Sequence, residues 1–143
     1  MSSSPNRIVG GIFGAVYVLV GLLGFAVTGG VGFIATKGGL LLGLFAVNPL
    51  HNIVHLLIGA VLLLAAFSGV RAAKGANGTV GFVYLLVGIV GFFIADTAAN
   101  ILALNTADHV LHLASALVLI VVSLAADRAV SASPTRLTPS PAP

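Results

Sequence analysis

Long apolar stretches recur along the chain at intervals that predict four membrane-spanning segments. They cover residues 8–27, 49–68, 79–95 and 106–126. About 20 helical residues, each rising 1.5 Å, are needed to cross the roughly 30 Å of hydrocarbon in a bilayer. Backbone polar groups in lipid must be satisfied within their own element, and none of the stretches alternates as a barrel strand does. The pattern therefore predicts an all-α integral membrane protein, a four-helix bundle.

Composition strengthens this prediction and removes other classes of protein. Hydrophobic residues make up 59% of the chain and charged residues 6%, whereas a soluble domain carries about a quarter charged residues. A soluble enzyme is therefore excluded. The net charge is +3 and no run of basic residues occurs, which excludes a nucleic-acid partner. With no cysteine, the chain has neither disulfides nor a thiolate metal site.

The distribution of basic residues predicts the orientation of the spans. Lys37 alone follows the first span, whereas the other basic residues flank the spans on the opposite side: Arg7, Arg71, Lys74, Arg128 and Arg136. Positive charge concentrates on the cytoplasmic side of membrane proteins. We therefore expect both termini in the cytoplasm, with residues 1–7 as a short N-terminal segment and residues 127–143 as a disordered tail.

Two segments of the first half of the chain recur in the second half. Residues 14–25 resemble residues 81–92, with Gly, Tyr, Gly and Gly at the same offsets, and residues 44–48 resemble residues 101–105. The order of the matches predicts a tandem-duplicated helical hairpin, with repeat one at about 8–70 and repeat two at about 75–126. Because each repeat contains two spans, a pseudo-twofold axis would run along the membrane normal. Chance similarity between Gly- and Leu-rich helices is the alternative.

The glycines and tyrosines that recur at matching offsets predict how the helices pack, and the asparagines before two spans predict where those helices begin. Gly14, Tyr17, Gly21 and Gly24 fall on one helical face, as do their counterparts at 81, 84, 88 and 91. Small residues on one face let helix backbones approach closely. Asn48 and Asn105 precede the second and fourth spans, and asparagine is a favoured helix N-cap. Residues 38–47 are too few to span, and we expect an interfacial segment there.

All four histidines fall just inside the second and fourth spans. His51 and His55 are separated by four residues, His109 and His112 by three, and Asp108 precedes His112 by one turn. Such spacings place side chains on one helical face. His55 and His112 each follow a cap asparagine by seven residues, which corresponds to about 10 Å of helix. We expect these side chains to face the bundle interior, where ionisable groups in membranes find partners.

Three interpretations of this polar group remain open. The histidines could hydrogen-bond across helices and to Asn52, Asn100 or Asp108. They could instead bind a cofactor: a divalent transition metal held by candidate ligands, or a haem held by His55 and His112. The candidate metal ligands are His51, His55, His109, His112 and Asp108. A proton path through Asp96, Asp108 and the histidines is the third interpretation, but the opposite halves of the spans carry no ionisable continuation.

The run from Asn48 to Gly59, with its Asn-Pro-Leu-His-Asn-x-x-His core, carries a resemblance to a known family. Together with residues 7–25 and 107–112 it resembles domain-of-unknown-function family 4383, and the resemblance covers about residues 7–126. It implies a four-span protein of the bacterial plasma membrane and assigns no activity. The expectation is therefore a small non-catalytic membrane protein, an accessory or structural subunit of a larger complex or a self-associating one. The alternative is a haem- or metal-binding redox component.

Overall fold

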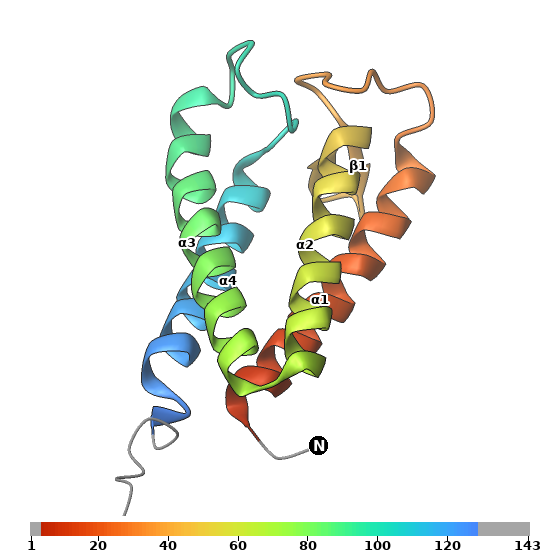
Figure 1. The fold of residues 1–143 in the computed structure, drawn as a ribbon. Helices are drawn as coiled ribbons and strands as arrows, with labels where there is room; N and C mark the ends of the chain where they lie inside the picture. The colour runs from red at the N-terminus through yellow and green to blue at the C-terminus, as the bar shows by residue number, and fades with distance from the viewer. Residues whose placement is uncertain (1–3, 129–143) are drawn as a thin grey trace, which may run out of the picture.

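A computed structural model of the chain describes residues 4–128 and contains four long apolar helices (Figure 1). The helices are α1 (Pro5–Gly24), α2 (Pro49–Ser68), α3 (Val70–Ile94) and α4 (Thr106–Ala125). A single 3-10 turn, η1 (Phe25–Val27), extends α1. Each of the four helices is long and apolar enough to cross a membrane, as the sequence predicted.

The four helices pack as two hairpins, α1 against α2 and α3 against α4. In Figure 1 the start of α1, the end of α4 and the α2–α3 junction lie at one end of the molecule, which we call the terminal end. The connections at residues 28–48 and 95–105 lie at the other, which we call the loop end. Each hairpin is therefore joined at the loop end, and the two hairpins are joined to each other at the terminal end.

Glycines permit the close approach of the helices within each hairpin. A Cβ atom added to Gly14 would lie 2.9 Å from the Gly59 carbonyl oxygen, and one added to Gly59 would lie 2.7 Å from the Gly14 carbonyl oxygen. In the second hairpin a Cβ on Gly81 would lie 2.8 Å from Ile120. The predicted glycine faces are thus buried against the partner helix, where small residues maximise van der Waals contact.

A small core joins the two hairpins near mid-height. Tyr17 and Tyr84 meet edge to face there, with ring centroids 5.2 Å apart. The remaining buried members of this core are Leu62, Val80, Ala116 and Leu119. Large apolar side chains elsewhere on the helices are mostly exposed, as expected for helices that face lipid.

The third helix begins earlier than the sequence predicted. A span starting at residue 79 and a loop carrying Arg71 and Lys74 were expected, but α3 starts at Val70, directly after Gly69. Gly69 has φ 136°, a conformation that side chains disfavour and glycine adopts readily. The chain therefore reverses at one residue, and the two basic residues lie in the first turns of α3.

The segment at residues 38–47 also departs from the prediction. Strands β1 (Gly39–Leu41) and β2 (Phe45–Val47) form a two-stranded antiparallel hairpin in which Leu40 pairs with Ala46. The architecture is therefore not purely α-helical. Leu42 and Gly43 form the turn with φ 55° and φ 70°, and this pair of left-handed residues is typical of a tight hairpin turn.

Basic side chains cap helix ends at the terminal end. The Arg7 Nε donates a 2.7 Å hydrogen bond to the carbonyl of Ala66 in the last turn of α2. The Lys74 Nζ lies 3.4 Å from the carbonyl oxygen of Ala126, just beyond α4. A cation at a helix C-terminus satisfies free carbonyls and opposes the negative end of the helix dipole.

Asp127 links the start of α1 to the segment after α4, whereas the sequence predicted that a disordered tail begins at residue 127. Its Oδ2 accepts hydrogen bonds from the Ser4 hydroxyl at 2.8 Å and from the Asn6 side chain at 2.9 Å. The Asn6 backbone N–H, in the first turn of α1, also donates to it. Residues 129–143, the rest of the predicted tail, lie outside the described residues, as do residues 1–3.

The Asp127 contacts predict a pH-dependent contribution to stability. Hydrogen bonds from Asn6 hold the pKa of this carboxyl below its usual value, so the folded state favours the carboxylate. The contribution is present above the unfolded pKa of about 3.9 and is lost as the pH falls through the lower folded pKa. We expect Asp127→Asn to lower the unfolding temperature in detergent at pH 7, and we expect the difference from wild type to shrink progressively as the pH is lowered below about 3.9.

The matched control is Asp96→Asn, which removes an exposed carboxylate at the loop end. Its effect on the unfolding temperature should be small at both pH values. If Asp127→Asn and Asp96→Asn shift the unfolding temperature equally, the hydrogen bonds of Asp127 with Ser4 and Asn6 contribute nothing specific to stability.

A pair of glycine substitutions tests the helix packing. Gly59→Ala places a Cβ atom against backbone of α1, and overpacking of this kind costs about 1–3 kcal/mol. Gly75→Ala makes the same change in α3 at a position with nothing within 4 Å, so it should raise helix stability by up to about 1 kcal/mol. Thermal unfolding in detergent measures both variants. Equal shifts in the same direction would contradict the proposed close contact between α1 and α2.

Candidate functional site, a histidine cluster at the loop end

The two helices that carry histidine begin with the caps that the sequence predicted. The Asn48 side chain accepts the backbone N–H of His51 at 2.8 Å, with Pro49 at the first helical position. The Asn105 side chain accepts the backbone N–H of Asp108 at 3.1 Å. The carboxylate of Asp108 completes a capping box by accepting the Asn105 backbone N–H at 2.9 Å. Both helix starts are therefore fixed by local hydrogen bonds.

The same two asparagines link the hairpins to each other. The Asn48 Nδ2 donates to the carbonyl of Ile101 at 2.7 Å, and the Asn105 Nδ2 donates to the carbonyl of Leu44 at 2.8 Å. Each cap therefore bonds to the backbone that precedes the cap of the other hairpin. The link brings the first turns of α2 and α4 together at the loop end.

Three histidines meet between these first turns. His51, His55 and His112 each have a ring nitrogen within 4.8 Å of a ring nitrogen of the other two. Ring centroids lie 4.3 Å apart for His51 and His55, and 6.2 Å apart for His55 and His112. Their exposed fractions are 1%, 6% and 4%. We call these three residues the histidine cluster.

The Nδ1 atom of every residue in the histidine cluster is buried without a hydrogen-bond partner. The sequence interpretation in which Asn52, Asn100 or Asp108 bonds to the histidines is therefore wrong for these atoms. The three proposed partners bond elsewhere: Asn52 to Thr28, Asn100 to Leu104 and Ala95, and Asp108 to Ala46 and Asn105. A buried polar atom left unpaired costs free energy, so these three nitrogens are unfavourable unless another group binds them.

Two tyrosines form the side of the cluster that faces the middle of the helices. The Tyr17 ring stacks on His55 with centroids 5.5 Å apart, and the Tyr84 ring packs on His112 at 4.9 Å. These contacts restrict the ring orientations of both histidines. From the sequence, Tyr17 and Tyr84 were expected only on the packing faces, and their contacts with the histidines were missed, although their recurrence at matching offsets in residues 14–25 and 81–92 was the available signal.

The other two candidate ligands lie outside the cluster. His109 packs against Phe92, with ring centroids 4.7 Å apart, and fits closely over Gly91 between α3 and α4. The Asp108 Oδ2 accepts the Ala46 backbone N–H at 3.2 Å in addition to its capping bond. Of the five predicted metal ligands, the structure therefore brings together three.

The cluster has the chemical properties of a nitrogen-donor metal site. Three imidazoles are the protein ligands of several tetrahedral zinc sites, in which a fourth position stays open. Ring nitrogens around such an ion lie about 3.4 Å apart, and in the cluster they lie within 4.8 Å of one another. Such a donor set suits Zn²⁺, Cu²⁺, Ni²⁺ or Co²⁺ and lacks the soft ligands that Cu⁺ prefers.

Comparisons with known proteins give one result. Neither the curated proteins nor the solved structures include a match to this chain. A family match extends from residue 7 to residue 125 and so includes α1 except its first two residues, the whole of the other three helices and every histidine. The chain belongs to the family described as "Domain of unknown function (DUF4383)".

Proposed function

We propose that this protein binds a single divalent transition-metal ion in the membrane through His51, His55 and His112. The observation that carries the proposal is the convergence of three buried ring nitrogens within 4.8 Å of one another. Three buried Nδ1 atoms without hydrogen-bond partners support it, because ligation would satisfy nitrogens that are otherwise costly to bury.

A metal ion accounts for this arrangement better than a purely structural role does. Interhelical hydrogen bonds between polar side chains are the usual stabilising contact in membrane bundles. In this cluster no Nδ1 atom has a hydrogen-bond partner, so one ring nitrogen of each histidine is buried without the compensating contact. Ligation would join α2 to α4 and stabilise the assembled hairpins.

A haem held by His55 and His112 is less well supported. Ligation from both sides of a porphyrin needs a flat space between two imidazoles. The His51 ring lies 4.3 Å from His55 and 5.9 Å from His112 by ring centroid, and those two rings lie 6.2 Å apart, so the three rings form a triangle and not an open slot between two imidazoles. Three imidazoles that surround one point favour a single ion with one exchangeable position.

We propose further that the two hairpins arose by tandem duplication. Gly21 and Gly88 support this, since a Cβ on either would meet equivalent atoms: Asn52 O and Leu56 in one hairpin, His109 O and Leu113 in the other. The two partners in each hairpin are separated by four residues, as are those in the other. The crossed bonds of Asn48 and Asn105 are a second reciprocal pair.

The basic residues at the terminal end and a serine of α4 support two further proposals, on the location of the protein and on its role. We propose that the protein lies in the bacterial plasma membrane with its terminal end toward the cytoplasm, because most basic residues cluster there. We also propose that it is a non-catalytic accessory subunit of a membrane complex. Ser123, one of two serines within α4, donates its hydroxyl to the carbonyl of Lys74 at 2.9 Å, which favours a packing role over a nucleophilic one.

Metal titration of the detergent-solubilised protein tests the proposed site. After removal of metal with a chelator, Co²⁺ should bind at one equivalent and give the visible absorption of a tetrahedral nitrogen site. We expect His51→Ala, His55→Ala and His112→Ala each to weaken binding on the order of 100-fold. Elemental analysis after Zn²⁺ loading and gel filtration gives the stoichiometry independently.

The matched control is His109→Asn, a change at another buried histidine of α4. It should leave both Co²⁺ affinity and the absorption spectrum unchanged, since the His109 ring packs on Phe92 and lies outside the cluster. Failure of the folded wild-type protein to bind any of the four divalent ions would refute the metal site. An absorption band of bound haem that disappears in His55→Ala and His112→Ala would replace it with the haem alternative.

A further inference from the structure

We infer that the metal ion reaches the histidine cluster from the loop end, through a polar cavity whose floor is fastened by the Asp108 carboxylate. The inference rests on the proposed metal site and concerns how that site is filled. It assigns a role to Asp108, which lies outside the cluster although the sequence grouped it with the histidines.

The cavity lies between the two connections at the loop end. It has a volume of about 880 Å³ and is lined by residues of both connections. Thr36 and Lys37 contribute from one side and Asp96 and Thr97 from the other, with Asn105 and Thr106 from the start of α4. We call this space the vestibule. Its polar lining allows a hydrated cation to enter.

Two alanines from the two hairpins close the floor of the vestibule. Ala46 and Ala103 both line the space and are almost fully buried. The backbone carbonyls of Ala46 and Leu102 lie beside the His51 imidazole. Ala46 therefore borders the vestibule on one side and the His51 imidazole of the histidine cluster on the other.

Asp108 fastens this floor. Its Oδ2 accepts backbone N–H groups of Ala46 and Asn105, both of which line the vestibule. His112 follows on the same face of α4, one turn deeper. The carboxylate therefore lies between the vestibule and the ligands. A cation that passes it gains electrostatic stabilisation before it exchanges water for imidazole.

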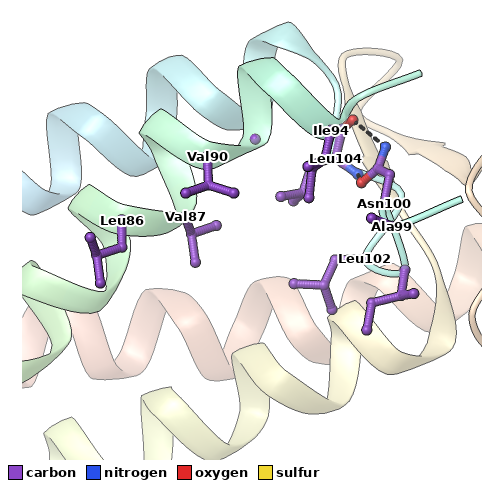
Figure 2. Close-up of a pocket in the computed structure, with 10 residues that line it drawn as sticks. Leu86, Val87, Val90, Ile94, Ala99, Asn100, Leu102 and Leu104 are labelled. Atoms are coloured by element: carbon purple, nitrogen blue, oxygen red, sulfur yellow. Dashed lines mark hydrogen bonds between the residues drawn. The ribbon is translucent and has the colours of Figure 1, made fainter. Parts of the chain in front are cut away.

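Two other directions of approach through the described residues are lined by apolar side chains. Toward the terminal end, the histidine cluster is followed by the tyrosines and by Leu62 and Leu119, which are fully buried. An apolar pocket on α3 is bordered by Val87, Val90 and Leu102, with Asn100 as its polar member (Figure 2). Such walls offer a cation no replacement for its hydration shell.

A groove between α1 and α4 does reach His55, but it opens toward lipid. Ile12, Val16 and Val118 line its sides, and all three are exposed on the apolar surface of the helices. A divalent cation would have to cross hydrocarbon to enter there, which is far costlier than approach from water. Of the routes bounded by described residues, the vestibule is therefore the one suited to an ion.

The direction of loading can be measured in liposomes. The chain has no cysteine, so Ala98→Cys at the loop end and Ala72→Cys at the terminal end report orientation through a membrane-impermeant maleimide. Metal-free protein is reconstituted, and Co²⁺ is added outside only. We expect the coloured fraction to equal the fraction whose loop end faces outward, and detergent to load the remainder. Loading of the opposite fraction, or of both, would overturn the inference.

The rate of Co²⁺ loading in detergent tests whether the charge of Asp108 assists the entry of the ion. Asp108→Asn keeps an oxygen acceptor for the floor but removes the charge, and it should slow loading on the order of 10-fold while one equivalent still binds. Asp127→Asn at the terminal end is the charge-matched control and should load at the wild-type rate. Equal rates in all three proteins would refute the role of Asp108.

A chemical modification tests the vestibule itself. A trimethylammonium thiol reagent on Ala98→Cys should slow loading relative to a sulfonate reagent, whereas both adducts of Ala72→Cys should load alike. Absence of any charge effect at position 98 would exclude the vestibule as the route. If the unmodified protein binds Co²⁺ in detergent, a negative result in any of these three experiments argues against the access route alone and leaves the proposed metal site intact.

Discussion

Two asparagine side chains hold the loop end of this protein together. Asn48 and Asn105 each cap a helix and each bond to the backbone of the opposite hairpin. In hydrocarbon or at its edge a carboxamide without partners is costly, so these bonds fix both the start of the helices and their mutual position. The histidine cluster depends on them, because its members come from both hairpins.

Within each hairpin a different contact dominates. Glycines on α1 and α3 allow α2 and α4 to approach until backbone atoms meet, and the hydrophobic effect contributes little between helices that are already in lipid. This tight pairing is confined to the hairpins. Between them lie the tyrosine pair and the histidines, whose polar atoms would be unfavourable in a uniformly apolar interface. A ligand-binding role is a physical reason to retain them.

Polarity is unevenly distributed along the length of the molecule. The loop end carries the vestibule, Asp108 and the histidine cluster, whereas the terminal end carries basic side chains that cap helices and the Asp127 contact. The middle contains Tyr17, Leu62 and Leu119. Under the proposed metal binding, a site placed in this way would exchange with water on one side of a membrane, and the apolar middle would separate it from the other side.

The sequence by itself determined the number of helices, the caps of α2 and α4 and the glycine faces, because these depend on local periodicity and on residues a few positions apart. It also placed the histidines on the correct helices, but spacing alone grouped His109 and Asp108 with the other three. Only the tertiary structure separated them, since the rotation of α4 against α3 turns His109 toward Phe92. The reversal at Gly69, the strand pairing of residues 39–47 and the partners of Asp127 likewise arise from backbone conformation and from contacts between distant residues, which hydrophobic pattern does not encode.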